Sequence, residues 1–356
     1  MARLFIPGPT DVHPEVLQAQ VQPMVGHRSK AFSQLYARIQ PRLREILQTE
    51  GRVYVTASSG SGIWEGAMRS VVARRLLLCV CGAFGQRWAE VAASNGTPFD
   101  QLEVEWGQAN LPEQVEAALK SGDYDTLAVV HNETSTGVES PVQEIAARAR
   151  SLRPDLVIMV DAVSSAGGVQ IPTDAWGLDI LIASSQKCFA LPPGLAFAAV
   201  SDRALERAAS VQNRGWYFDL LLLEKYHQRD TTPATPAISL LYALDFQLDR
   251  ILAEGMQARE ARHVRMANQV QSWAAERFEL FAAQGYRSKT VTSIRNTRSL
   301  DIPALNAHLS QHEMSIANGY GPLKDKTFRI GHMGEIQPAD VAELLSHIDE
   351  FLKTTR

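Results

Sequence analysis

The chain has 356 residues, of which 45% are hydrophobic and 21% charged, a composition typical of a globular protein large enough for two packed units. The formal net charge is −4 and no run of like charges occurs, so the sequence favours neither nucleic acid nor an anionic membrane surface as partner. No apolar stretch approaches the roughly 20 residues of a membrane-spanning helix, and the N-terminal MARLFIPGPT has too few apolar residues for a signal peptide. We therefore expect a cytoplasmic protein that acts on small molecules.

The first strong pattern in chain order is a series of short apolar runs rich in Val, Leu and Ile between residues 52 and 202. They are RVYVTAS, RLLLCVCG, TLAVVHNET, LVIMVDAV, DILIASSQ and LAFAAVSD. Helical patterns such as EQVEAALKSG and PVQEIAARARS lie between several of these runs. Because the runs are continuously apolar, they are typical of strands covered on both faces. The sequence predicts an α/β fold with a mostly parallel, doubly wound sheet.

The pattern changes at about Met256. A long helical stretch, EARHVRMANQVQSWAAERF, is followed by the β-like SKTVTSIRN, a helix, the glycine-rich turn ANGYGPL, the strand TFRIGHM and a final amphipathic helix, PADVAELLSHIDEFL. These elements predict a smaller α+β domain. We place a large domain with its N-terminal segment at residues 1–254 and the small domain at residues 255–356.

The three cysteines, Cys79, Cys81 and Cys188, lie inside or beside apolar runs. An odd number of cysteines in this setting predicts buried thiols in a reducing compartment rather than disulfides. Cys79 and Cys81 would share one strand face, but no further Cys or His spacing supports a metal site. We therefore expect no bound metal.

The residues that directly follow the apolar runs are the first place to look for a site, because open α/β sheets bind ligands beyond the carboxyl ends of their strands. After RVYVTA comes a serine- and glycine-rich segment, residues 58–62, and then a helical pattern with one apolar stripe. Hydroxyls and backbone N–H groups at a helix N-terminus favour a phosphate. A loop with an ordinary helix cap is the alternative interpretation of this segment.

Two charged residues also stand at the ends of predicted strands. Asp161 ends LVIMVD and Lys187 follows DILIASSQ. Taken singly, Asp161 is compatible with a turn-forming aspartate and Lys187 with a solvated lysine. Taken together with the phosphate cradle, they match what pyridoxal 5'-phosphate (PLP) requires, which is an anion site, a partner for the ring nitrogen and an amine for the aldehyde. Phe84 in GAFGQR is a candidate flat face for the ring, or else a core aromatic.

The chain resembles the class V, fold-type I aminotransferases, in particular the alanine/serine–glyoxylate (serine–pyruvate) group. The resemblance rests on segments that occur in family order along nearly the whole chain. They are PGPTDVHPEV, PMVGHRSKAF, SSGSGIWE, GAFGQRW, HNETSTGV, VDAVSSAGG, SSQKCFALPPG, TPAISLLYAL and FRIGHMG.

The resemblance implies a role for each matching residue. Lys187 would be the Schiff-base lysine and Asp161 the partner of the pyridinium nitrogen, while Arg329 would bind the substrate α-carboxylate. The remaining contacts to the cofactor would come from Phe84 and Val163 on the two ring faces, Thr134 at the ring hydroxyl, and Ser59, Gly60, Ser61 and Gln186 at the phosphate. Ser61 stands where some members carry histidine, and Phe84 where some carry tryptophan.

The resemblance further implies a homodimer in which the neighbouring subunit contributes a phosphate contact. Thr235 in TPAISLLYAL fits that role, and Tyr226 is a candidate for the accompanying tyrosine, although its spacing from Thr235 departs from the family pattern. Gly26, His27 and Arg28 lie in a segment that borders the active site in relatives. If Arg28 reads a second anionic group, phosphoserine or aspartate becomes the donor in place of serine or alanine.

The expected reaction transfers an amino group from a small amino acid to a 2-oxo acid, glyoxylate or pyruvate. A PLP-dependent lyase of the cysteine desulfurase kind shares the fold type, but it needs a mobile cysteine late in the chain, and none follows Cys188. A non-catalytic subunit that binds PLP is the third alternative. The presence of Lys187, Asp161 and Arg329 argues against it.

Overall fold

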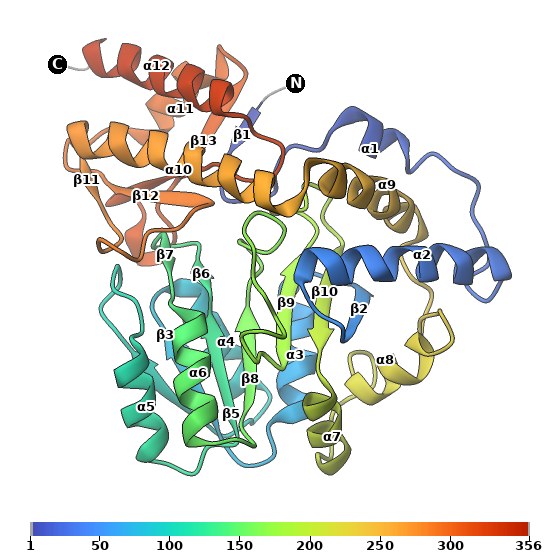
Figure 1. Cartoon of the computed structure of the whole chain (residues 1–356). Coiled ribbons are helices and arrows are strands. Elements are labelled where there is room, and N and C mark those ends of the chain that lie inside the picture. Colours follow the sequence, from blue (N-terminus) through green and yellow to red (C-terminus); the bar gives the residue numbers. More distant parts are fainter. Residues whose placement is uncertain (1–2, 355–356) are drawn as a thin grey trace.

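The computed structural model describes residues 3–354 and contains two main sheets, one above the other in Figure 1. The larger is a seven-stranded sheet in which only β10 runs antiparallel to its neighbours. Its strands, in spatial order, are β2 (Arg52–Ala57), β10 (Leu195–Val200), β9 (Ile180–Ser184), β8 (Val157–Asp161), β5 (Thr126–Val130), β3 (Leu76–Val80) and β4 (Phe99–Glu103). The predicted mostly parallel α/β sheet is confirmed. The apolar runs of the sequence do not include its edge strand β4, which is the least buried of the seven.

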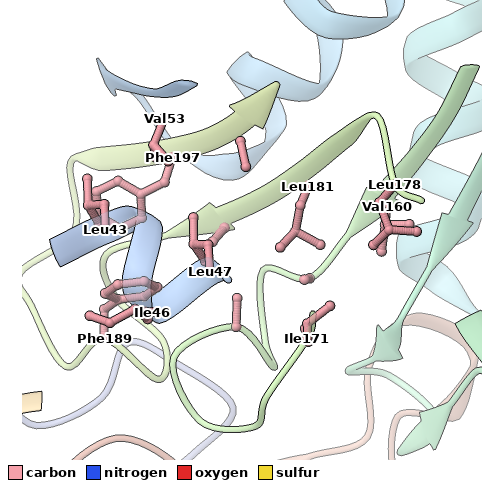
Figure 2. Close-up of a cluster of buried hydrophobic side chains, with 14 of the residues drawn as sticks. Leu43, Ile46, Leu47, Val53, Val160, Ile171, Leu178, Leu181, Phe189 and Phe197 are labelled. Carbon is pink, nitrogen blue, oxygen red and sulfur yellow. The ribbon is translucent and has the colours of Figure 1, made fainter. Parts of the chain in front are cut away.

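Helices cover both faces of the larger sheet, so neighbouring residues of each strand enter different cores. On one face, Val160 of β8 and Leu181 of β9 join a cluster with Leu43 and Leu47 of helix α2, shown in Figure 2. On the other face, Met159 and its neighbours pack against helices α3 and α4. The helices around this sheet are α1 (Pro14–Gln18), α2 (Lys30–Leu47), α3 (Gly60–Val71), α4 (Ala83–Ser94), α5 (Pro112–Lys120), α6 (Val142–Leu152), α7 (Asp202–Ser210), α8 (Leu220–His227) and α9 (Ile238–Glu254).

The smaller sheet has five strands and its own core. Its order is β1 (Arg3–Phe5), β13 (Met314–Asn318), β14 (Thr327–Gly331), β12 (Val291–Arg295) and β11 (Glu279–Leu280). Helices α10 (Met256–Arg277), α11 (Ile302–Ser310) and α12 (Pro338–Thr354) pack with it. Strand β1 joins this sheet from the start of the chain, so the smaller unit is not built from C-terminal residues alone. The division between residues 254 and 255 stays a prediction.

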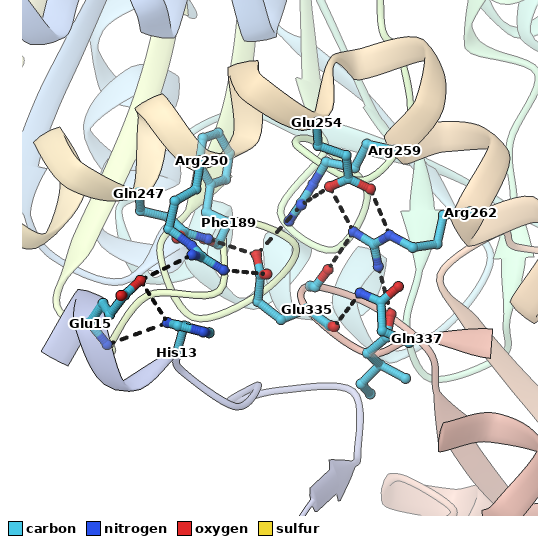
Figure 3. A network of polar contacts seen from close by, with 12 residues as sticks. His13, Glu15, Phe189, Gln247, Arg250, Glu254, Arg259, Arg262, Glu335 and Gln337 are labelled. Atoms are coloured by element: carbon cyan, nitrogen blue, oxygen red, sulfur yellow. Dashed lines mark hydrogen bonds and ion pairs between the residues drawn. The ribbon is translucent and has the colours of Figure 1, made fainter. Parts of the chain in front are cut away.

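A charged network connects α9 and α10 to the loops that follow β9 and β14 (Figure 3). Arg259, only 1% exposed, donates to the carbonyls of Gly167 and Cys188 at 2.7 Å each and to Glu254 at 2.6 Å. Arg262 also binds Glu254, at 2.6 Å. We call these groups, together with Glu335, the junction network. It fixes the carbonyl next to Lys187 in the chain.

Two expectations about the chain as a whole can now be compared with the structure. All three cysteines are buried and free, as predicted. No helix within residues 3–354 is both long and apolar enough to cross a membrane.

Candidate active site

A cavity of about 300 Å³ opens where β5, β8 and β9 end. Its walls come from the loops after these strands, from the first turns of α3 and α4, and from Tyr320 between β13 and β14. Many of the predicted site residues line it, although they are up to 128 positions apart in the chain. These are Ser59, Gly60, Ser61, Phe84, Thr134, Asp161, Val163, Gln186 and Lys187.

Asp161 is the last residue of β8 and is 4% exposed. Burial raises the pKa of its carboxyl to about 7, and the nearby Glu133 carboxylate acts in the same direction. The backbone N–H of Val163 donates to Asp161 Oδ1 at 2.8 Å and opposes this rise. A cation placed beside Asp161 would lower the pKa again and keep the carboxylate ionised.

Lys187 lies in the turn after β9, the strand that pairs in parallel with β8. Burial lowers the pKa of its amine to about 8, and the neighbouring Arg329 guanidinium lowers it further. The amine donates to the carbonyl of Pro7. Gly8 leaves room for this approach, because a Cβ atom there would lie 2.6 Å from the Lys187 Nζ atom. Its φ of +104° also favours glycine. The lowered pKa makes Lys187 a stronger candidate nucleophile than an ordinary lysine.

The serine- and glycine-rich segment forms the N-terminus of α3, with Ser59 as N-cap and Gly60 as first residue. Gly60 lies so close to Val163 that an added Cβ would approach a Val163 methyl to 2.6 Å. Within the described chain, the side chain of Ser59 makes no capping hydrogen bond to the helix. The free N–H groups and the helix dipole therefore remain available to an anion in the cavity.

An aromatic pair forms another wall. The Phe84 and Tyr320 rings stack with their centroids 5.5 Å apart and an interplanar angle of 24°. Arg87 lies over the Phe84 ring at 4.9 Å and donates to the Tyr320 hydroxyl at 2.5 Å. Phe84 thus contacts protein side chains here, and its predicted stacking on a cofactor ring stays a prediction.

Arg329 lies beside the cavity on β14 and is 8% exposed. It donates to the backbone carbonyls of Asn318 and Thr134 at 3.1 and 3.3 Å, and its guanidinium lies over Tyr320. Burial lowers the pKa of Arg329 to about 10, while the Glu133 carboxylate acts in the opposite direction. Among residues 3–354, the guanidinium is therefore oriented by two backbone carbonyls and not by a carboxylate. This leaves Arg329 suited to receive a carboxylate from a ligand.

Several polar atoms of the lining have no hydrogen-bond partner among the described residues. They are the Trp64 Nε1, Asn132 Oδ1 and Gln186 Oε1 atoms, all shielded from solvent. Buried polar groups are nearly always paired with protein or water in native proteins. These three atoms are therefore candidates for contacts with water or with a polar ligand of the cavity.

The residues predicted near a partner subunit gather elsewhere. Arg28 donates to the Thr231 hydroxyl at 2.9 Å and to the Pro233 carbonyl at 3.0 Å, and its guanidinium lies over the Tyr226 ring at 5.1 Å. The Thr231 hydroxyl in turn donates to the His27 carbonyl. Thr235 and Gly26 are exposed close by in the chain. None of Gly26, His27, Arg28, Tyr226 and Thr235 lines the cavity at Lys187 of the same chain.

Sequence reasoning missed some of the lining, notably Trp64, Arg87, Asn132 and Tyr320. Asn132 is the second residue after β5 and begins the short strand β6 (Asn132–Glu133), so its position near a strand end was a usable signal. Tyr320 and Arg87 come into contact through the packing of the two sheets, and no local sequence pattern predicts that contact.

A comparison with known families identifies the chain. The model of the family described as Aminotransferase class-V matches residues 11–320. The chain belongs to this family. As a class V aminotransferase, it has the fold and the enzyme class that its sequence predicts.

Curated relatives and a solved structure agree on this class. The chain is 38% identical to an uncharacterised aminotransferase of Methanocaldococcus jannaschii, over 98% of this chain and 92% of that protein. It is 31% identical both to an L-aspartate–glyoxylate aminotransferase of Paracoccus denitrificans (94% and 87% covered) and to a serine–glyoxylate aminotransferase of Methylorubrum extorquens (99% and 92%). The structure of an alanine–glyoxylate aminotransferase from Nostoc sp. has a TM-score of 0.92 at 31% identity, covering 99% of this chain and 96% of that one.

Proposed function

We propose that this aminotransferase uses PLP to transfer the amino group of serine or alanine to glyoxylate or pyruvate. The observation that carries the proposal is that Lys187 and Asp161 line the same cavity. The pKa of the Lys187 amine is lowered to about 8, and the pKa of the Asp161 carboxyl is raised to about 7. Relatives named for glyoxylate support the choice of acceptor.

The cavity residues fit PLP group by group. The Lys187 amine would hold the aldehyde carbon and Asp161 would face the ring nitrogen. Phe84 and Val163 would bound the ring, and Thr134 would reach its hydroxyl. The N-terminus of α3, with Ser59, Gly60 and Ser61, would hold the phosphate. Gln186, whose Oε1 atom has no hydrogen-bond partner among the described residues, lies on the same wall. When bound, PLP supplies a ring that stabilises negative charge at the substrate α-carbon.

Three side chains of this chain would have different roles in the reaction. An ionised Asp161 favours a protonated ring nitrogen, which increases the electron demand of the ring. Because its pKa is near 8, Lys187 Nζ can accept and return the proton of the substrate α-carbon near neutral pH. Arg329, oriented by two carbonyls, would bind the substrate carboxylate and so fix the α-carbon relative to Lys187.

A second candidate donor is a dianionic amino acid, aspartate or phosphoserine. The observation that favours it is Arg87, a further guanidinium that lines the cavity. Arg28, which the sequence suggested for this role, is bound to the Thr231–Pro233 segment and does not line the cavity of its own chain. Arg28 would have to act from a partner subunit.

We also propose a homodimer that works in the cytoplasm. Val21 and Met24, just before the Gly26–Arg28 segment, and Trp216 and Tyr217 are large apolar side chains with exposed fractions of 74%, 63%, 62% and 46%. Apolar groups exposed to this extent are typical of a protein interface. Thr235 and Tyr226 would then contact the partner's cofactor phosphate. The three buried free thiols support a reducing compartment.

A donor and acceptor screen tests the proposal. The protein is loaded with PLP and incubated with serine, alanine, aspartate or phosphoserine and with glyoxylate or pyruvate, and the new amino and oxo acids are quantified. We expect kcat/KM at least tenfold higher for serine or alanine with glyoxylate than for the dianionic donors. A preference for aspartate or phosphoserine that is lost in Arg87→Leu would select the second candidate, and no transfer with any pair would overturn the proposal.

A further inference from the structure

Three histidines and a glutamate gather on the small unit, away from the cavity. The ligating atoms of His308, His312, His347 and Glu350 all lie within 4.8 Å of one another. None of the four lines the cavity at Lys187. We call these residues the α11–α12 cluster, and neither the family nor the reaction assigns it a role.

Helices α11 and α12 and the turn after α11 place these side chains. His308 lies in the last turn of α11, and His312 lies in the turn that follows, where its backbone N–H donates to the Leu309 carbonyl and its ring centroid is 5.5 Å from that of His308. His347 and Glu350 are three positions apart in α12 and share a face. Because α11 and α12 pack together on the small core, the two pairs meet. Three of the four proposed ligands therefore lie on helices, and His312 lies in the short turn between α11 and β13.

The histidines of the cluster contact one another and Glu350, and in the described part of the chain one ring nitrogen is left unpaired. The His312 and His347 rings stack with centroids 3.6 Å apart and an interplanar angle of 15°. The His347 Nδ1 atom is 2.9 Å from Glu350 Oε2. The Nε2 atom of His308 is shielded from solvent and, among residues 3–354, has no hydrogen-bond partner. A shielded nitrogen without a partner costs free energy unless something binds it.

We propose that the α11–α12 cluster binds a divalent metal ion of the zinc class, with His308, His312, His347 and Glu350 as ligands. Three imidazoles and one carboxylate suit late first-row ions, whereas Mg²⁺ and Ca²⁺ prefer oxygen ligands throughout. In a tetrahedral zinc site with bonds of about 2.0–2.1 Å, neighbouring ligand atoms lie about 3.4 Å apart. The present ligand atoms lie within 4.8 Å of one another, and binding would require the stacked His312 and His347 rings to rotate so that a nitrogen of each points at the ion.

The position of the cluster defines what the metal would do. Glu343, which also interacts electrostatically with His347 and His312, adds negative charge close by, although it is bound by Arg3 at 2.6 Å. A metal ion held by both helices would cross-link α11 to α12. It would stabilise the small unit without contacting the catalytic groups, so we expect an effect on unfolding and none on turnover. No metal was expected from the sequence because no Cys or His spacing supports a site with Cys79 and Cys81, whereas this cluster combines two residues of α12 with His308 and His312, which precede them by 35 or more positions.

The test uses untagged, PLP-loaded protein that has been treated with a chelator and dialysed. Zn²⁺ alone is titrated by calorimetry, and Co²⁺ alone is followed by its visible absorption, which reports tetrahedral coordination without thiolate. We expect one ion per chain with a Kd of micromolar or below, and a melting temperature raised by about 3 °C or more at saturation. His312→Gln and His347→Gln should each weaken binding at least tenfold and leave kcat unchanged.

The matched control is His13→Gln, since His13 lies outside the cluster, at the N-cap of α1, where its side chain contacts Glu15. It should bind both ions as the unchanged protein does. Absence of stoichiometric binding in the unchanged protein would overturn the proposal. Equal binding by the His312→Gln and His347→Gln variants would also overturn it, because the ion would then be held elsewhere. Circular dichroism and turnover equal to those of the unchanged protein would show that the His312→Gln and His347→Gln variants are folded.

Discussion

The cavity at Lys187 and the junction network are adjacent in the chain, but the balance between burial and charge pairing differs in the two regions. At the junction, burial alone would raise the pKa of Glu254, but the hydrogen bonds and charges of Arg262 and Arg259 outweigh it and lower that pKa. In the cavity, burial prevails, so the pKa of Asp161 rises and that of Lys187 falls. At the junction, opposite charges are paired and stabilise the fold. In the cavity, Asp161 and Lys187 keep shifted pKa values that suit them to bind a ligand.

The largest effect on stability should come from breaking the junction network. In Arg259→Met, Glu254 and the carbonyls of Gly167 and Cys188 lose a buried partner, and we expect the free energy of unfolding to fall by about 3–5 kcal/mol. Denaturant unfolding with a constant m-value measures this loss. Arg265→Met, an exposed position on the same helix, is the control and should change stability by less than about 0.5 kcal/mol. Equal losses in the two variants would mean that the network is not a stabilising element.

The counterpart in the cavity is Asp161→Asn. An amide of the same shape cannot hold a proton on the ring nitrogen by charge, so we expect kcat to fall by about 100-fold or more with little loss of stability. Steady-state kinetics with the donor selected by the screen gives the value. Asp155→Asn, in an exposed position just before β8, should retain full activity. A kcat for Asp161→Asn within threefold of the unchanged enzyme would contradict the role given to this carboxylate.

The pKa of Lys187 sets a pH dependence. Only the neutral amine is nucleophilic. Because the pKa of Lys187 is about 8 rather than the usual 10.5, about half of the Lys187 side chains are neutral at pH 8. At that pH the neutral fraction is about 100-fold larger than for an ordinary lysine. The rate at which the cofactor-free protein captures PLP should therefore rise with pH and level off above about pH 8, as followed by absorbance. A rate that is still rising at pH 10 would contradict the lowered pKa.

The smallest of these effects is expected for Arg329→Lys. Lysine keeps the charge but loses the planar, two-pronged donor geometry, so KM for the amino donor should rise about 10–30-fold while kcat changes less. Arg265→Lys is the matched control on the surface. If KM stays within twofold, another group binds the substrate carboxylate, and Arg87 is then the next residue to change.

The sequence predicted most of the larger sheet because each buried strand is a continuous apolar run. For the same reason it predicted Asp161 and Lys187, which directly follow such runs. It did not predict β1 as part of the small sheet, since three residues at the start of the chain carry no signal of a partner 311 positions away, the separation of Arg3 and Met314.

The parts of the site that escaped prediction depend on packing between distant segments. Tyr320 contacts Phe84 only because the β13–β14 connection lies over the cavity, and Arg87 is aimed by that same tyrosine. Arg28 was predicted near the substrate, yet it is bound to the segment that leads to Thr235. The role proposed for it is in the cavity of a partner subunit.

The most direct test of the central claim is chemical trapping at Lys187. The protein is incubated with PLP, reduced with borohydride, digested and analysed by mass spectrometry, with Lys187→Ala and Lys120→Ala as variants. We predict that the unchanged protein and Lys120→Ala carry the reduced cofactor on the peptide containing Lys187, and that Lys187→Ala carries none and has no transaminase activity. Label on a different lysine, or turnover by Lys187→Ala comparable to that of the unchanged protein, would contradict the account.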